Sequence, residues 1–425
     1  MIITFPLFVA IIFFLFNQGN ENVGYVDGVS IIYFISFVIV PMQKISDRSF
    51  EYSGIGNGVT YQLEYFLIVS GLALVSYIAL AFFLRKSISN RGSPNFDVSV
   101  NGSVLIIIAL TFALVAVFVS GSIDNLQASR GIKVYSDYGP TIDVLSALLC
   151  VNAVFSILRM DTNKVSKLLT CIFCCGCLLF VANPFNSSRF VLLGVWIPVL
   201  ISIFPSILRL GIFYLATPFI LLVMLPVLNL TTRLDSWEFD SDTVYGYGDS
   251  IFVISFFDLF ECCCEALRYI SRFGYQNGEL FLFTISAYIP RSFWPDKPVN
   301  SGLLIGRMNV REGLHNENLA VPWFMDGYMD FGIVGSVLYG LVLAGAFVLI
   351  RKKLSVHVKG VDLAFLMFIA NIAILVRGTL GVVMHLYIFE ILGLVLYSKM
   401  FLQRQPSLRS DPSIAPPRLM EQGRR

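Results

Sequence analysis

The chain has 425 residues, of which 56% are hydrophobic and only 14% are charged, and its mean hydropathy is +0.76. These values lie far outside the range of soluble domains, and they indicate an integral membrane protein whose main partner is the lipid bilayer. The formal net charge is only +2 and the basic residues are spread over short loops, so nucleic acid is not an expected partner.

Apolar runs long enough to cross about 30 Å of hydrocarbon recur along the chain. The first run lacks the basic start and the small-residue cleavage site of a signal peptide, so we interpret it as a transmembrane span. The pattern predicts an all-α polytopic membrane protein with about eleven transmembrane helices, in a range of ten to twelve. These spans lie near residues 2–17, 28–43, 64–84, 103–120, 140–158, 168–183, 190–208, 210–230, 332–350, 360–376 and 379–398.

Basic residues in the short loops predict the orientation of these spans. Four loops that fall on one side of the membrane carry Arg85, Lys86 and Arg91; Arg159, Lys164 and Lys167; Arg209; and Arg351, Lys352, Lys353 and Lys359. The positive-inside rule makes this side cytoplasmic and places the N-terminus outside. Lys44 and Arg48 are the exceptions, because they fall on the outer side.

This orientation divides the chain into four segments. Residues 1–230 are predicted to form an N-terminal transmembrane bundle of about eight spans, and residues 231–331 a long outer loop that contains short helices. Residues 332–400 supply about three C-terminal spans, and residues 401–425 are expected to be a disordered cytoplasmic tail. The outer loop is the only long one, and long loops in compact proteins usually carry function.

The cysteines fall in two groups that we interpret as packing residues. Cys171, Cys174, Cys175 and Cys177 lie within an apolar span, and Cys262, Cys263 and Cys264 are consecutive. A membrane zinc site would need polar groups around its ligands, and the surrounding apolar sequence offers none. We therefore expect no metal and no cofactor.

Charge is divided unevenly along the outer loop. Its first part contains eight acids and no Lys or Arg between Leu234 and Leu267: Asp235, Glu238, Asp240, Asp242, Asp249, Asp258, Glu261 and Glu265. Its second part, residues 288–311, contains Arg291, Lys297, Arg307 and Arg311 against the single acid Asp296. Between the two, residues 251–267 have the apolar spacing of an amphipathic or re-entrant helix.

The basic part of the loop suits an anionic ligand. Guanidinium groups fit phosphate oxygens in pairs and keep their proton, so a lipid phosphate or diphosphate is the natural candidate. In the stretch YIPRSFWPDKP, residues 288–298, three prolines restrict the backbone, and Phe293 and Trp294 are suited to headgroup depth. The alternative is an interfacial anchor whose cations pair with Asp296 or with lipid headgroups.

The spacing in this stretch resembles a known family. Arg291 is followed, after ten residues, by Gly302, a pattern similar to that in an outer loop of the Wzy O-antigen polymerases, which polymerise oligosaccharide repeat units of bacterial surface polysaccharides. The resemblance to this family extends to two further stretches, NPFNSSRF at 183–190 and VPWFMDGYMDFGIVG at 321–335. The family often has a second such motif, but Arg189 has Leu200 rather than glycine at the matching distance. The specific motifs cover about 60 residues.

The resemblance implies a membrane glycosyltransferase of the bacterial inner membrane, acting at the outer leaflet. It would move a growing glycan from undecaprenyl diphosphate to the non-reducing end of a lipid-linked repeat unit of O-antigen, capsule or exopolysaccharide. A flippase and a chain-length regulator would be its partners. On this reading Arg291, Arg189 and His315 are catalytic, with Glu317 as an alternative base. Arg311, Arg307, Lys297 and Gly302 would bind substrate, and Gly302 would let the backbone turn.

Other interpretations of these residues remain open. Arg189 is also explained as an interface arginine that reaches lipid headgroups, and His315 as a solvated loop residue. An O-antigen ligase is an alternative, because His315 is followed after eleven residues by Gly327, close to the spacing of ligase loops. A flippase for lipid-linked oligosaccharide is a second alternative, but we would expect it to have charged spans and short outer loops. Glu390 lies five residues after His385 in a span, so each should find its partner on another helix.

Overall fold

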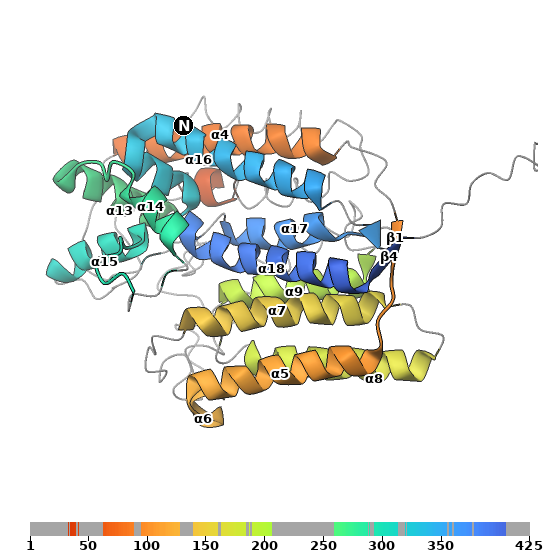
Figure 1. The fold of residues 1–425 in the computed structure, drawn as a ribbon. Helices are drawn as coiled ribbons and strands as arrows, with labels where there is room; N and C mark the ends of the chain where they lie inside the picture. The colour runs from red at the N-terminus through yellow and green to blue at the C-terminus, as the bar shows by residue number, and fades with distance from the viewer. Residues whose placement is uncertain are drawn as a thin grey trace, which may run out of the picture.

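The computed structural model describes residues 33, 35–39, 41, 63–88, 95–127, 139–159, 163–183, 187, 189–205, 259–287, 289, 293–312, 319, 321–354, 357–358, 361–375 and 378–404. The predicted spans near 2–17 and 210–230 lie outside these residues. Of the span near 28–43, the structure describes chiefly a short π-helix, η1 (Ile35–Ile39). The chain is mostly helical over the part described (Figure 1).

Long helices occupy the positions that the apolar windows predicted, with ends within about five residues except at α16, which begins at Trp323, inside the predicted outer loop. They are α4 (Leu63–Ile88), α5 (Gly102–Ser120), α7 (Gly139–Leu158), α8 (Lys164–Val181), α9 (Arg189–Ile203), α16 (Trp323–Lys353), α17 (Leu363–Leu375) and α18 (Leu380–Phe401). Within the described ranges, five stretches are long and apolar enough to cross a membrane: Gly102–Ser120, Thr141–Leu158, Lys164–Val181, Trp323–Lys353 and Met384–Phe401.

The outer helices of the bundle expose apolar side chains. On α5, Ile107, Leu114 and Phe118 are 62%, 60% and 86% exposed. The other side of α5 presents the small residues Ala109, Ala113 and Ala116 to the bundle, where they are buried. A helix that is apolar all round but buried on one side only is stable when its other side faces lipid. The exposure therefore indicates a membrane protein.

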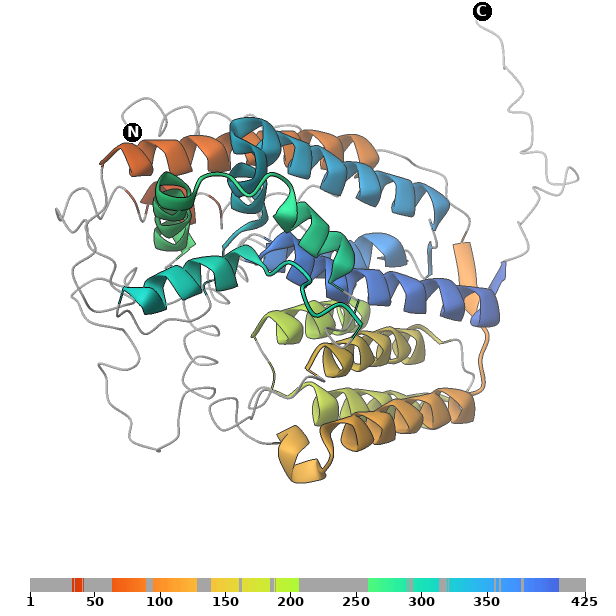
Figure 2. The ribbon, with the colours of Figure 1, turned by 60° about the vertical axis from the view of Figure 1, so that its left-hand side comes forward.

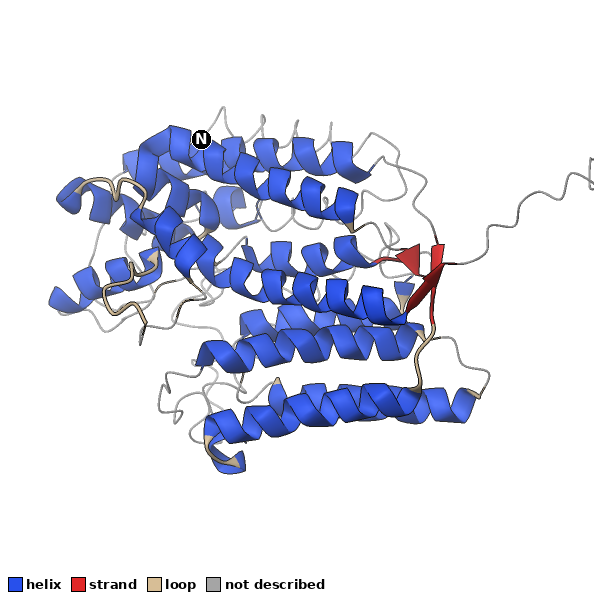
Figure 3. Ribbon diagram, viewed as in Figure 1, coloured by secondary structure: helices blue, strands red, loops and turns tan. Residues whose placement is uncertain are grey.

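A four-stranded sheet closes one end of the bundle (Figure 3). Its strands are β1 (Asn95–Val98), β2 (His357–Val358), β3 (Val361–Asp362) and β4 (Leu402–Arg404), in the order β3-β2-β1-β4. Strand β1 is parallel to β2 and antiparallel to β4, and β2 is antiparallel to β3. This sheet was not predicted from the sequence, because each strand is too short to show an alternating pattern.

The sheet corrects one expected boundary. The tail was predicted to be disordered from residue 401, but Phe401 ends α18 and Leu402–Arg404 forms β4. Phe96 pairs with Arg404 and Val98 with Leu402, so the backbone of β4 is held by a ladder to β1. The disorder was predicted from the composition of the tail, which offers few apolar side chains to bury. Hydrogen bonds between backbone groups do not require apolar side chains, so composition could not exclude a short strand.

The predicted basic loops meet at the sheet. Strands β1, β2 and β4 follow α4, α16 and α18 in the chain, and Arg159, directly after α7, forms a bridge with Val98. The described cations of this end include Arg159, Lys164, Lys167, Arg351, Lys352 and Lys353. The described ends of three of the four predicted basic loops therefore lie at the sheet, and the loop that carries Arg209 lies outside the described residues.

Three short helices from the predicted outer loop lie at the opposite end of the bundle (Figures 1 and 2). They are α13 (Leu259–Phe273), α14 (Glu279–Ser286) and α15 (Ser301–Arg311). A fourth short helix, α6 (Ile123–Gln127), follows α5. The helical spacing predicted over 251–267 is confirmed from Leu259 onward, and the residues before it lie outside the description.

Helix α16 is bent where the predicted loop and the predicted span adjoin. Phe331 and Gly332 have non-helical backbone angles, and Gly332 has a φ of 64° and a ψ of −150°, which strongly favours glycine. Gly327 and Gly335 touch across the bend, although eight residues of straight helix span about 12 Å. The first two turns of α16 therefore fold back onto the rest of the helix, and Ser336 Oγ donates to the Phe324 carbonyl at 2.8 Å.

We predict that Gly335→Ala destabilises the protein. A Cβ at Gly335 would overlap the carbonyl oxygen of Gly327, so the bend must open. Overpacking of this kind typically costs about 1–3 kcal/mol, which exceeds the roughly 1 kcal/mol that alanine gains in helix propensity. Thermal unfolding in detergent should show a lower midpoint.

The matched control is Gly345→Ala on the same helix, where an added Cβ meets nothing within 4 Å. This variant should unfold at the natural temperature or slightly above it. Equal midpoints for the two variants would contradict the close contact at the bend.

Candidate functional site

Asp326, on the first part of α16, joins two other helices. Ser301 Oγ donates to Asp326 Oδ1 at 2.5 Å, and the Leu380 N–H donates to Oδ2 at 2.8 Å. Ser301 begins α15 and Leu380 begins α18, and both Ser301 and Asp326 are buried. One carboxylate therefore holds the starts of α15 and α18 together.

Asp330, one turn later and fully buried, caps α14. Its two oxygens accept from the N–H groups of Leu280 and Phe281 at 3.1 and 2.9 Å, and the Tyr339 hydroxyl donates to Oδ2 at 2.5 Å. The residue at the start of α14, Gly278, offers no side chain of its own. A carboxylate at a helix N-terminus satisfies unpaired N–H groups and is favoured by the helix dipole. Asp330 thus supplies the missing cap from a distant helix.

Both aspartates lie in the stretch VPWFMDGYMDFGIVG, and no site role was predicted for them from the sequence. Their spacing of four places both aspartates on one helix face, and this spacing is the feature of the sequence that indicates a shared role. Their partners at the starts of the three helices lie 25 to 54 positions away, so sequence alone could not name them.

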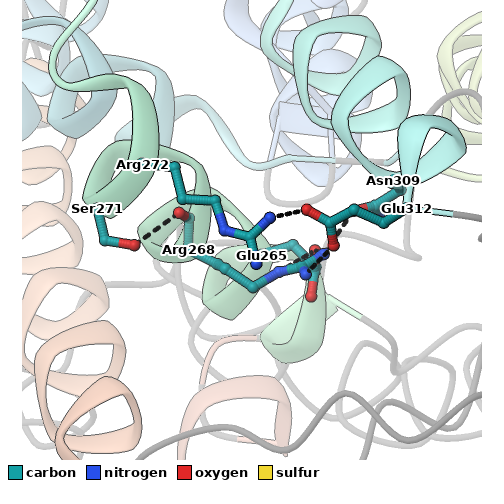
Figure 4. Close-up of polar contacts among 6 residues, drawn as sticks. All are labelled: Glu265, Arg268, Ser271, Arg272, Asn309 and Glu312. Atoms are coloured by element: carbon teal, nitrogen blue, oxygen red, sulfur yellow. Dashed lines mark hydrogen bonds and ion pairs between the residues drawn. The ribbon is translucent and has the colours of Figure 1, made fainter.

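Arginine and acid side chains link α13 to α15 (Figure 4). Arg268 donates from Nε to Glu265 Oε2 at 3.0 Å and from Nη2 to Asn309 Oδ1 at 2.7 Å. Its Nη1 bonds to Glu312, and Arg272 Nη1 bonds to the other oxygen of that carboxylate. Arg268 and Arg272 were not among the predicted site residues, because they follow the acidic stretch and belong to neither part of the loop.

Arg307 and Arg311 lie on the exposed side of α15, one turn apart. Neither guanidinium forms a hydrogen bond or ion pair with another residue that the structure describes. Burial raises the pKa of the Tyr269 phenol on α13, and the nearby charge of Arg311 partly opposes that rise. Arg311 directly precedes Glu312, whose carboxylate bonds to the two arginines of α13, so Arg311 lies beside the cluster of Figure 4.

Lys297 has a structural role in the loop that was predicted to bind substrate. Its ammonium donates to the carbonyls of Ile289 and Ala287 at 2.9 and 3.3 Å, and it lies 5.9 Å from the centre of the Phe283 ring. These bonds close the segment that contains Arg291. Phe293, at the tip, is 83% exposed.

The turn expected at Gly302 is not observed. Asn300 caps α15 by accepting from the Leu303 N–H at 2.7 Å, so Gly302 falls in the first helical turn and has no positive φ. Gly302 is buried, and its carbonyl accepts from the Leu319 N–H at 3.3 Å. The capping asparagine decided where the helix begins.

Two of the three predicted catalytic residues, Arg291 and His315, lie outside the residues described. Arg189 is the first residue of α9, and its side chain is not described. Trp196 Nε1 donates to the Ala182 carbonyl at 3.1 Å, so α9 begins beside the end of α8 that is remote from the sheet. Arg189 is therefore at the same end of the bundle as α13–α15.

Glu390 has its partner on another helix, as the sequence predicted. Asn371 Nδ2, on α17, donates to Glu390 Oε2 at 2.5 Å, and both residues are fully buried in the bundle. His385 lies near the Phe389 ring, with ring centres 5.3 Å apart. Its side chain is only partly buried.

The fold and the site define a mostly helical protein with several membrane-length apolar helices and an arginine-rich assembly of short helices at one end. Comparisons with protein-family models, with curated proteins and with solved structures find no match for this chain.

We predict that Asp330→Ala strongly destabilises the protein. The change leaves two N–H groups and the Tyr339 hydroxyl buried without their acceptor, and each unpaired group costs about 1–3 kcal/mol. Asp330→Asn keeps one acceptor oxygen, so its loss of stability should be intermediate. Thermal unfolding of the purified chain measures this order, and an unchanged midpoint for Asp330→Ala would contradict the capping role.

Lys297→Met should loosen the segment around Arg291 without unfolding the bundle. Methionine keeps the apolar stem but loses the charged donor to two carbonyls. Such bonds are worth about 1.5–3 kcal/mol, so local opening should become roughly tenfold more frequent or greater. Mass spectrometry after brief chymotrypsin treatment should detect faster cleavage after Phe293. Asp296→Asn is the control, because Asp296 is exposed, and equal cleavage rates would refute the closure by Lys297.

Proposed function

We propose that this chain is a Wzy-type polymerase of bacterial surface polysaccharide. The observation that carries the proposal is the arginine-rich assembly of α13 and α15, which lies at the end of the bundle opposite the basic loops. The spacing of Arg291 and Gly302 supports the family, and the arginines of α13 and α15 support an anionic ligand.

The proposed topology has about eleven spans in the bacterial inner membrane. The basic loops at the sheet lie in the cytoplasm under the positive-inside rule. Residues 231–331 then lie in the periplasm, and α13–α15 meet the outer leaflet. The substrate, an oligosaccharide linked to undecaprenyl diphosphate, would reach α15 from the bilayer with its diphosphate at headgroup depth.

The proposed reaction needs little from the protein beyond fixed charge. The bond between the anomeric carbon and a diphosphate oxygen breaks, and a bond forms from that carbon to a hydroxyl oxygen of the acceptor. Arginines stabilise the negative charge that develops on the leaving diphosphate. We assign this role to Arg291 and Arg189, with Arg311 and Arg307 as substrate ligands. His315 takes the proton from the acceptor hydroxyl, and undecaprenyl diphosphate is released.

A strain that lacks the protein tests this function. We expect the deletion to leave surface glycan of single repeat units, and the natural chain to restore a ladder of longer products on a gel. Arg291→Ala at matched membrane abundance should restore at most about one hundredth of the long product, because removing one charge-stabilising group typically costs roughly 10²–10³ in rate.

Lys352→Ala is the control, since it removes an exposed cation at the opposite end of the bundle. It should restore the full ladder. If the deletion removes even single units, a ligase or a flippase explains the chain better than a polymerase. A full ladder with Arg291→Ala would reject our assignment of Arg291 whatever the function.

A further inference from the structure

Glu312 holds two arginines at once. Its Oε2 is bonded by Arg268 and its Oε1 by Arg272, so both oxygens of one carboxylate are engaged by guanidinium groups (Figure 4). The two arginines are spaced by four on α13 and so lie on one face of that helix. An oxyanion with two neighbouring oxygens is thus already bound between them.

The bonds on the two sides of this cluster differ in exposure. Glu265 is fully buried, and Arg268, which it binds, is only 12% exposed. Arg272 is 49% exposed, and the Glu312 side chain is 25% exposed. Exposed ion pairs contribute little to stability, because water solvates the separated charges well. We therefore expect the ion pair between Glu265 and Arg268 to persist, whereas the bonds of Glu312 to Arg268 and Arg272 are the ones that a ligand can replace.

We propose that Arg268 and Arg272 form a binding site for a phosphate or diphosphate group, and that Glu312 occupies this site until the ligand displaces it. A phosphate offers oxygens in pairs, as a carboxylate does, and carries more charge, so it competes well for the same guanidinium groups. Arg311, which directly precedes Glu312 at the end of α15, adds a further cation for a second phosphate.

Displacement also has a structural consequence. Glu312 ends α15, where its N–H donates to the Asn309 carbonyl at 3.0 Å. Release of its side chain removes two bonds that tie the end of α15 to α13. His315 is the third residue after Glu312 in the chain, so we expect the arrival of a phosphate to be coupled to the segment that carries the proposed base. This last step rests on the proposed function; the anion site does not.

Titration of the purified full-length chain in lipid nanodiscs with inorganic pyrophosphate tests the site. Arg272→Gln should weaken binding roughly tenfold or more, because it removes a charge-assisted bond. Glu312→Gln should strengthen binding about three- to tenfold, because the amide competes less well for the arginines. An acid that only supports the site would have the opposite effect when neutralised, so the sign of the change is decisive.

Glu279→Gln is the matched control, since it neutralises an exposed acid at the start of α14 that does not belong to the cluster of Arg268, Arg272 and Glu312. It should change the affinity less than twofold. Thermal unfolding of each variant verifies that it is folded. A parallel titration with a polyprenyl diphosphate in the nanodisc distinguishes a lipid-linked ligand, which should bind more tightly, from free diphosphate.

The outcomes separate this site from the proposed function. Weaker or unchanged binding in Glu312→Gln would overturn the displacement, and a lack of any binding by the natural chain and by Glu312→Gln would overturn the site. If both variants behave as expected but the deletion strain still makes the full ladder, the anion site stands and the polymerase is rejected.

Discussion

Two buried carboxylates, Asp326 and Asp330, hold the short helices to the bundle. A buried carboxylate is very costly unless its oxygens are hydrogen-bonded. Each of these accepts at both oxygens, and the donors come from the starts of α14, α15 and α18 and from Tyr339. The arrangement is therefore cooperative, because loss of any one helix start leaves a carboxylate without its donor.

The positions of the arginines on α15 depend on this arrangement. Ser301, bound to Asp326, fixes the start of α15, and the length of that helix then sets where Arg307, Arg311 and Glu312 lie. The bend at Gly332 makes the arrangement possible, because it turns Asp326 toward the starts of α15 and α18 and Asp330 toward the start of α14. Charged groups that act on an anion need such fixed positions, since groups that must first reorganise stabilise it less.

Features that depend on local sequence were predicted, whereas features that depend on contacts between distant segments were not. Apolar windows located α5, α7, α8 and α18 within a few residues, because a helix in lipid must be apolar along its whole length. The roles predicted for two site residues in the basic part of the loop differ from what is observed. Lys297 binds backbone carbonyls, and Gly302 lies in a helix rather than at a turn. Arg268 and Arg272 were missed, since their importance comes from Glu312, forty or more positions away.

The sequence by itself determined that the chain is helical and apolar enough for a membrane, and that the chain from Tyr288 to Arg311 is rich in cations. Both follow from local composition and periodicity, which each segment carries independently of the others. Only the tertiary structure decided which cations are committed and which are free for a ligand. Lys297 is bound to its own loop, Arg268 to Glu265, and Arg272 to an acid that is partly exposed. Those pairings depend on distances between segments that are remote in the chain, and sequence spacing carries no such distances.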